Sequence, residues 1–260
     1  GSADTGEATV SPATLTFTPS GGTAWNIAQT VTVTGVDDDI IDPGQLTTIT
    51  VSVDDANSDN NWDPLLNQTV TVTTVNDDVA GFTIVESGGS TSVTEAAGAS
   101  HTDTYTVVLT AQPATNVVLT VGSADTGEAT VSPATLTFTP TGGTAWNIAQ
   151  TVTVTGVDEL IDDGNQATNV TVSVDDANSD NNWDPLANQT VSVTTVDDDV
   201  AGFTILESGG STSVTEAAGA GNTDTYTVVL TSEPTSNVVL TVGSADTGEA
   251  TVSPATLTFT

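Results

Sequence analysis

The chain has 260 residues, of which 34 are Asp or Glu, one is His and none is Lys, Arg or Cys, so its formal net charge is -34. We therefore expect no nucleic-acid partner and no attachment to anionic membranes, because both need basic side chains, and disulfides are excluded. Repulsion of this size opposes a compact fold unless bound cations offset it. No run approaches the roughly 20 apolar residues of a membrane helix, so we expect no membrane insertion.

An internal repeat organises the whole chain. The segment that begins at Gly1 recurs at Gly122 and again at Gly243, an offset of 121 residues each time. Residues 1–121 and 122–242 differ at 19 positions, and most of these changes are mild. A period of this length matches one domain and is too long for one turn of a solenoid. The sequence therefore predicts tandem domains arranged as beads on a string, with repeats of the same chain as neighbours.

Acidic runs mark the predicted domain boundaries, because Asp77-Asp78 precedes Val79 and Asp198-Asp199 precedes the equivalent Val200. We expect residues 1–78 to be the C-terminal part of a repeat domain, 79–199 a complete β-sandwich repeat, and 200–260 the N-terminal part of the next repeat. Residues 200–242 and 1–78 together make one further whole unit. The chain is then either a window on a continuous array or a subunit that completes its domain with strands from a neighbour.

Alternating Thr and Val residues predict β-strands along the whole chain. Segments such as Thr151-Val152-Thr153-Val154-Thr155 have the period of two of half-buried strands, and β-branched residues favour a pleated backbone. Gly, Pro, Asn and Asp cluster between these segments. In the central repeat the pattern predicts strands near residues 81–86, 91–95, 103–110, 116–122, 135–139, 149–156, 168–174 and 189–196. This arrangement is typical of an all-β, Ig-like Greek-key β-sandwich.

Each repeat carries two Trp residues, which in the central copy are Trp146, just before a strand, and Trp183, in an acidic loop. We expect both side chains to plug the ends of the sandwich. The alternative is a carbohydrate-stacking platform, for which Trp183 is the better candidate because its loop is polar. Glycans are therefore possible partners.

The acidic side chains gather at predicted strand ends, where the loops of a sandwich meet. Carboxylates brought together there repel each other unless a cation lies among them, and Ca²⁺ binds about six to eight oxygen ligands. In the central repeat the groups are Glu86 and Glu95; Asp125; Asp158, Glu159, Asp162 and Asp163; Asp175, Asp176, Asp180 and Asp184; and Asp197, Asp198 and Asp199. The sequence therefore predicts Ca²⁺ as the bound cofactor.

The order of these motifs resembles the Calx-β family, in particular the Calx-β-like repeats of large bacterial surface and adhesin proteins. The resemblance covers the whole 121-residue unit. Calx-β domains are seven-stranded sandwiches that bind Ca²⁺ at one pole. The resembling segments are Val93-Thr94-Glu95, Ser123-Ala124-Asp125-Thr126-Gly127, Val154-Thr155-Gly156-Val157-Asp158-Glu159, Asp162-Asp163-Gly164 and Asp197-Asp198-Asp199. The resemblance implies ligands at Glu95, Asp125, Asp158, Glu159, Asp163, Asp197, Asp198 and Asp199.

The first copy departs from this pattern at several positions. Asn76 stands where the central repeat has Asp197, and Pro43-Gly44 replaces Gly164-Asn165. The affinity for Ca²⁺ or the number of sites is therefore expected to differ between copies. The candidate ligands in the first copy are Asp37, Asp38, Asp42, Asp77 and Asp78.

The loop from Asp176 to Asp184, repeated at residues 55–63, is a second candidate metal site. Oxygen-bearing side chains at alternate positions, including Asn178 and Asp180, resemble the start of an EF-hand loop. The sixth position is Asn181, however, where an EF-hand has Gly, and the twelfth is Ala187, where it has Glu. A Ca²⁺ loop and an Asx-rich solvated loop both fit the pattern.

No catalytic constellation is apparent, and we expect no enzymatic activity. The only histidine, His101, is replaced by Asn222 in the next copy, which argues against a catalytic role for it. Paired carboxylates could in principle hydrolyse sugars, but the chain has no large insertion that could form a cleft around them. The first hypothesis is a calcium-stiffened spacer or extender of a giant secreted protein, in adhesion or extracellular matrix at the cell surface. The second is a self-assembling extracellular filament or sheath, in which like chains are the partners. The third is a glycan-binding module.

Overall fold

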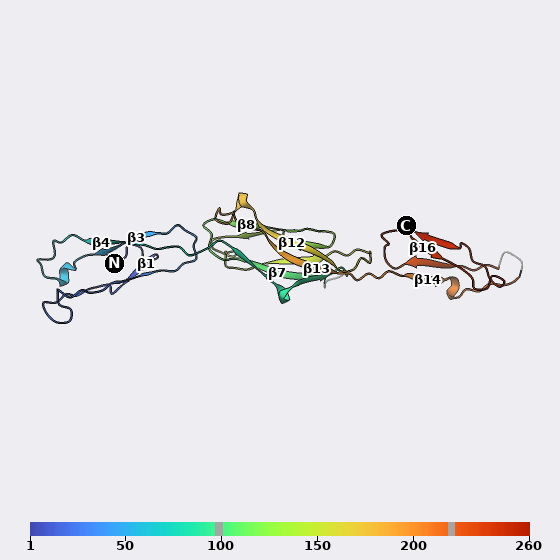
Figure 1. Cartoon of the computed structure of the whole chain (residues 1–260), viewed down its shortest axis with the longest axis horizontal. Coiled ribbons are helices and arrows are strands. Elements are labelled where there is room, and N and C mark those ends of the chain that lie inside the picture. The colour runs from blue at the N-terminus through green and yellow to red at the C-terminus, as the bar shows by residue number, and fades with distance from the viewer. Residues whose placement is uncertain (97–100, 218–221) are drawn as a thin grey trace.

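The computed structural model describes residues 1–96, 101–217 and 222–260, and these residues form three β-rich units that follow one another along the long axis (Figure 1). Helical structure in these ranges consists of short 3₁₀ turns, which are η1 Asp55–Asn57, η2 Ser87–Gly89, η3 Asp176–Asn178 and η4 Ser208–Gly210. None of the helices in the described residues is long and apolar enough to cross a membrane. The predicted all-β class is confirmed.

The central unit is a sandwich of two sheets. One sheet has the strand order β5-β7-β11-β9, and the other has the order β10-β8-β12-β13-β6. The described pairings are antiparallel except that of β13 with β6, which is parallel. The strands are β5 Phe82–Glu86, β6 Thr91–Thr94, β7 Thr102–Leu109, β8 Val117–Ser123, β9 Ala129–Ser132, β10 Thr135–Phe138, β11 Gln150–Gly156, β12 Gln166–Val174 and β13 Gln189–Val196. The predicted Greek-key sandwich is confirmed.

The core of this sandwich follows the alternation of Val and Thr. In β11, Val152 and Val154 are fully buried, whereas Thr151 is exposed and Thr153 is only partly buried. The fully buried Val170 of β12 lies in the facing sheet. Burial of branched side chains from both sheets removes apolar area from water, which is the main force that holds such a sandwich together.

Strand β9 is one element that the sequence pattern did not predict. Residues 129–132 alternate apolar and polar side chains over only four positions, contain a single Val and are followed by Pro133, so the pattern is too short to predict a strand. The strand forms because β11 offers it an edge, with Thr153 opposite Ser132 and Gly156 opposite Ala129. Tertiary pairing has therefore supplied what the local pattern lacked.

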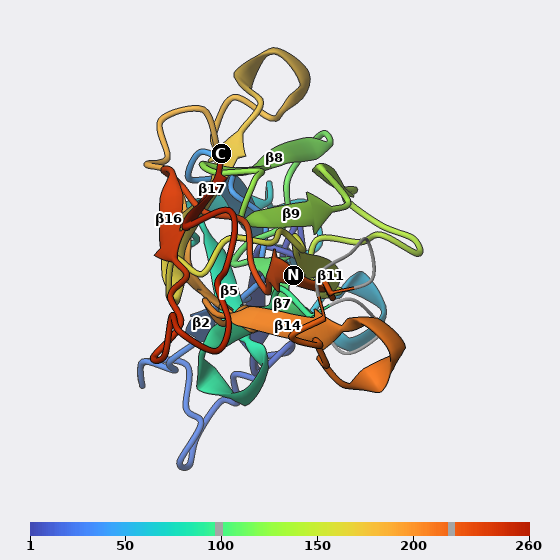
Figure 2. The ribbon, with the colours of Figure 1, turned by 90° about the vertical axis from the view of Figure 1, so that its right-hand side faces the viewer.

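The two outer units contain strand pairs that correspond to subsets of the central sheets. In residues 1–78, β1 Ala8–Ser11 pairs with β2 Thr32–Gly35, and β3 Leu46–Val51 pairs with β4 Gln68–Thr73. In residues 200–260, β14 Phe203–Glu207 pairs with β15 Tyr226–Leu230, and β16 Val238–Thr241 pairs with β17 Thr256–Phe259. Figure 2 shows the molecule turned so that this last unit faces the viewer. The boundaries near residues 79 and 199 stay predictions.

Candidate metal centre

Carboxylates gather at one end of the central sandwich, which we call the acidic pole. It lies where β6, β11 and β13 end, at Thr94, Gly156 and Val196. Glu95 directly follows β6, and its backbone N–H donates to Val196 O at 3.1 Å. Gly156 lies against the backbone of Thr94 so closely that a Cβ would clash with Thr94 O. A glycine at this position therefore lets β6 and Glu95 approach the end of β11.

Glu95 is the most unusual side chain of the acidic pole, because it is a carboxylate in the core. It is 1% exposed, and neither Oε1 nor Oε2 has a hydrogen-bond partner. Its burial, followed by the charges of Asp197, Glu128, Glu159 and Asp163, raises the pKa of Glu95 to about 7. An unpaired charge in such a place is costly, so Glu95 needs either a proton or a cation.

Two sets of carboxylates meet at Glu95. One oxygen each from Glu95, Asp198 and Asp199 lie within 4.8 Å of one another, and the same holds for Glu95, Glu159 and Asp163. Burial raises the pKa of Glu159, and the charges of Asp163, Asp197, Asp199 and Glu233 raise it further. The structure therefore brings four predicted ligands close to a fifth, the buried Glu95.

Three other predicted ligands of the central repeat lie at the acidic pole but outside these two sets. Asp197 shapes the loop, since its Oδ2 accepts from Gly164 N at 2.7 Å and its Oδ1 from Asp199 N at 2.8 Å. Asp125 Oδ1 accepts from Gly127 N at 2.9 Å. The charge of Asp158 contributes to the raised pKa of Asp199, for which burial is the first cause.

Glu128 is a member of the acidic pole that the sequence analysis missed. Its Oε2 is buried without a hydrogen-bond partner. Burial, and then the charges of Asp163, Asp125 and Glu159, raise its pKa. The sequence does contain a sign of its importance, because Glu recurs at the equivalent positions of the other copies, Glu7 and Glu249. Glu128 was not among the predicted ligands because it directly precedes β9, and without that strand it does not lie at a predicted strand end.

The predicted ligands of the first copy also lie together. They line a small cavity of about 40 Å³ whose walls include Glu7, Asp37, Asp38, Asp42, Asp77 and Asp78. Burial, followed by the charges of Asp77, Asp38, Asp39 and Asp37, raises the pKa of Asp78. Residues 1–78 contain no counterpart of Glu95, so this acidic group lacks the carboxylate that dominates the central one.

The Asp176–Asp184 loop lies at the opposite end of the sandwich, which we call the tryptophan pole. Asp180 is 7% exposed, and its Oδ2 accepts from Ala114 N at 2.8 Å and from Thr115 N at 3.0 Å. Asn178 Nδ2 donates to Asp175 Oδ2 at 2.9 Å. Asp176 and Asn178 are exposed, whereas Asp184 Oδ1 is buried without a partner. The loop braces the β7–β8 turn through Asp180, which favours the Asx-rich alternative over a Ca²⁺ loop.

Trp183 fills the tryptophan pole from within. Its side chain is fully buried in the core, and its Nε1 donates to Gly81 O at 3.4 Å. Trp146 is partly buried and packs against the same core. Both therefore plug the end of the sandwich as expected. The suggestion that Trp183 is a carbohydrate platform is wrong for the central repeat, because a buried indole offers no face to a sugar.

The donor set at Glu95 consists of carboxylate oxygens, with no nitrogen or sulfur in either set. Such donors suit a hard divalent cation, and Ca²⁺ tolerates irregular geometry and bidentate carboxylates better than Mg²⁺ does. The buried, unpartnered oxygens of Glu95 fit a cation of this kind. Bound among these side chains, it would offset the repulsion that contributes to the raised pKa values of Glu95, Glu159 and Asp199.

No protein-family model matches this chain, and no curated protein matches it. Among solved structures the chain is similar to domains 4 and 5 of the S-layer protein SbsC, with 19% identity over 73% of this chain and 70% of that chain and a TM-score of 0.33. It is also similar to the apo-form Calx CBD1 domain, with 13% identity over 45% of this chain and 98% of that chain and a TM-score of 0.30. A structure of SbsC domains 1–6 shows 16% identity over 98% of this chain and 32% of that chain, with a TM-score of 0.34.

Proposed function

We propose that the chain is a calcium-stiffened repeat segment of a secreted surface protein, acting as a structural spacer or extender in adhesion or extracellular matrix. One observation carries the proposal: Glu95 is a buried carboxylate without a partner, and Glu159, Asp163, Asp198 and Asp199 meet around it. In a chain with no Lys or Arg, a bound cation is the available source of the positive charge that such a cluster needs.

The positions of these residues explain why Ca²⁺ would stiffen the chain. Glu95 directly follows β6, Glu159 and Asp163 lie between β11 and β12, and Asp198 and Asp199 belong to the linker between β13 and β14. Ca²⁺ supplies positive charge and several coordination bonds at once. Side chains from three segments would then be held together, and the linker would be tied to the sandwich that it leaves.

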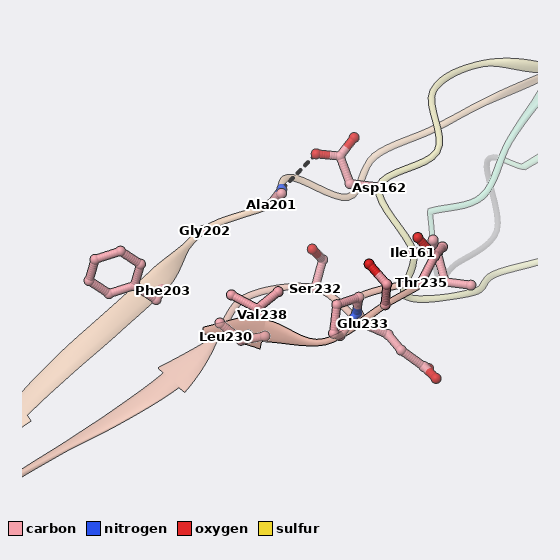
Figure 3. A pocket seen from close by; sticks show the side chains of 12 residues that line it. Ile161, Asp162, Ala201, Gly202, Phe203, Leu230, Ser232, Glu233, Thr235 and Val238 are labelled. Atoms are coloured by element: carbon pink, nitrogen blue, oxygen red, sulfur yellow. Dashed lines mark hydrogen bonds between the residues drawn. The ribbon is translucent and has the colours of Figure 1, made fainter. Parts of the chain in front are cut away.

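The β11–β12 loop also touches the unit that follows. Asp162 Oδ2 accepts from Ala201 N at 2.7 Å (Figure 3), and Glu233 N donates to Leu160 O at 2.5 Å. A cation held by Glu159 and Asp163 of the same loop would restrict this contact. Ca²⁺ binding and the angle between successive units are therefore expected to be coupled.

An extracellular location belongs to the same proposal. Ca²⁺ sites of extracellular modules have dissociation constants of about 10⁻⁴ to 10⁻³ M, which suits a partly exposed carboxylate cluster. The chain also lacks every Lys and Arg at which trypsin-like proteases cleave. Both features fit a long, exposed structural protein.

Calorimetric titration with Ca²⁺ tests the proposal. We expect saturable binding to the chain, a clear loss of affinity in Glu95→Gln, and unchanged binding in Asp176→Asn, which removes one exposed carboxylate at the tryptophan pole. Absence of binding at millimolar Ca²⁺, or equal binding by Glu95→Gln and the parent chain, would show that the acidic pole is not a metal centre.

A further inference from the structure

A loop of the preceding unit reaches the central sandwich at the tryptophan pole. Residues 36–45 connect β2 with β3, and within them Asp39 O accepts from Gln112 N at 2.6 Å. Ile40 forms a parallel bridge with the same Gln112, which lies in the β7–β8 turn. Gln112 Nε2 in turn donates to Pro140 O at 3.3 Å. The loop is therefore fixed through the backbone to a turn that belongs to the complete repeat.

Ile41, the next residue of this loop, takes part in the core of the central sandwich. Its side chain is partly buried and packs against the hydrophobic cluster that includes Trp183 and Ala111. Ala80, from the linker, packs against the same cluster. Apolar area from one unit is thus removed from water by the core of the next, which is a favourable term for both.

The same backbone contact recurs at the second junction, between the central repeat and residues 200–260. There Leu160 O accepts from Glu233 N at 2.5 Å. Leu160 is the counterpart of Asp39, and Glu233 is the counterpart of Gln112. A loop that follows β11, or its equivalent β2, therefore touches the next unit at both junctions, and this contact is a property of the repeat.

The side chains that accompany this contact differ between the two junctions. Asp162 stands in the central repeat where the first copy has Ile41. Asp162 Oδ2 accepts from Ala201 N at 2.7 Å, as Figure 3 shows. Asp162 is exposed, so water competes for this hydrogen bond and limits its net contribution. The first junction is held by an apolar side chain and the second by a solvated polar contact.

The second junction also carries a charge that the first does not have at the equivalent place. Glu233 is acidic, whereas Gln112 is neutral. The charge of Glu233 contributes to the raised pKa of Glu159, for which burial is the first cause. Glu159 precedes Leu160 in the same loop and belongs to the acidic pole. Glu233 therefore repels the acidic pole across the junction, and a cation bound there would turn this repulsion into attraction.

We infer that the two junctions are joints of different kinds. The first is an apolar joint that Ile41 holds closed without a metal, and the second is a polar joint that closes when Ca²⁺ binds at the acidic pole. The second joint rests on the proposed function, and the first stands without it. In tandem repeats each interface between neighbours adds its own term to stability, so the residue at this loop position sets how stiff each junction is.

Distances between spin labels across each junction test the inference. The chain has no Cys, so labels attach only at introduced ones. Thr34→Cys with Thr190→Cys spans the first junction, and Thr190→Cys with Thr204→Cys spans the second, all at exposed strand positions. Pulsed electron paramagnetic resonance should give a narrow distance distribution across the first junction in both Ca²⁺ and EDTA. Across the second it should be narrow in Ca²⁺ and clearly broader in EDTA.

Exchange of the two loop residues sharpens the test. Ile41→Asp should broaden the distribution across the first junction and lower the melting temperature of the central sandwich by about 5 °C or more, because a carboxylate replaces an apolar side chain at its core. Asp162→Ile should make the second junction less sensitive to EDTA. Glu233→Gln should narrow the second distribution in EDTA and leave it unchanged in Ca²⁺.

The matched control is Ile40→Asp, which adds the same charge one residue earlier in the loop. Ile40 is 38% exposed and is not among the side chains packed against the core, so its change should affect the melting temperature much less than Ile41→Asp does. Equal effects of the two variants would show that added charge, and not loss of the apolar contact, weakens the first joint.

Equal broadening by EDTA at both junctions, or a narrow first junction in Ile41→Asp, would overturn the inference. The proposed function fails separately, because it is tested by Ca²⁺ binding to the parent chain and to Glu95→Gln. A chain that binds Ca²⁺ through Glu95 while its second junction stays unchanged would refute the polar joint and leave the metal centre in place.

Discussion

The central repeat and the first copy have nearly the same sequence but differ in what they bury. Trp183 is fully buried and Trp62 is 60% exposed, although both follow the same eleven residues. Residues 1–78 contain β1 to β4, which correspond to β9, β11, β12 and β13, and contain no strands that correspond to β5 to β8. The difference teaches that the core of this fold is shared between the two halves of the repeat and belongs to neither alone.

The same comparison holds at the acidic pole. In the central repeat, Glu95 comes from the first half of the unit, and Glu159, Asp163, Asp198 and Asp199 come from the second half or the linker. Residues 1–78 contain no counterpart of Glu95. They do contain counterparts of the other four acidic residues, which are Asp38, Asp42, Asp77 and Asp78. A complete sandwich is therefore needed for the buried carboxylate as well as for the core.

Replacing the two tryptophans would test this comparison most strongly. Trp183→Ala should lower the free energy of unfolding of the central sandwich by about 3–5 kcal/mol, because it empties a fully buried site. Trp62→Ala should have little effect on the free energy of unfolding, because its side chain is already exposed to water. Chemical denaturation followed by circular dichroism measures both, and equal losses would mean that the first copy is packed like the central one.

Removal of calcium should come next in size. At about 100 times the dissociation constant, which is roughly 10 mM Ca²⁺ for a constant near 10⁻⁴ M, binding stabilises the folded state by about 3 kcal/mol, which EDTA would abolish. Scanning calorimetry with and without chelator measures the shift in melting temperature. Glu95→Gln should be much less sensitive to EDTA than the parent chain. A melting temperature that EDTA leaves unchanged contradicts the metal centre.

The calcium-free protein should become less stable as the pH rises from about 4.5 to about 7. The pKa of Glu95 is about 7 in the fold and near its ordinary 4.5 when unfolded, so the folded state holds the extra proton in this range. The free energy of unfolding is therefore greatest below the pKa that Glu95 has in the unfolded chain. It falls by about 3 kcal/mol as the pH rises to the pKa that Glu95 has in the fold. Melting curves in EDTA across this range measure the effect.

Glu95→Gln should flatten that pH dependence, because the amide does not titrate. Ca²⁺ should reverse its sign in the parent chain, since the metal binds the ionised carboxylates. A calcium-free parent chain with the same slope as Glu95→Gln would show that the titrating group lies elsewhere.

Removing the charges of Asp198 and Asp199 in the linker should have the smallest effect on the free energy of unfolding. It should still change the angle between the central unit and the unit that follows. Asp198→Asn with Asp199→Asn leaves the core untouched and removes two negative charges from the acidic pole. We expect an unchanged fold and a wider distribution of angles between the central unit and residues 200–260. Small-angle scattering in Ca²⁺ tests this, and a curve identical to that of the parent would refute the role of the linker.

Much of the acidic pole could be predicted from the sequence, because its carboxylates occur in short acidic runs at the ends of predicted strands. Glu95, Glu159, Asp163, Asp198 and Asp199 were expected and do meet. Glu128 was missed, since nothing local shows that its Oε2 is buried. Asp180 was expected as a ligand candidate, whereas its Oδ2 accepts from the backbone N–H groups of Ala114 and Thr115 and its Oδ1 accepts from Asn182 N.

The sequence by itself determined the repeat, the β class, most strand positions and the excess of negative charge. These follow from identity at a fixed offset, from the alternation of Val with Thr, and from the absence of Lys and Arg. Only the tertiary structure decided that β9 is a strand, that Glu95 is a buried carboxylate, and that Trp183 is covered while Trp62 is not. The reason is physical, because burial depends on what packs from the other sheet, and identical segments can differ completely in that respect.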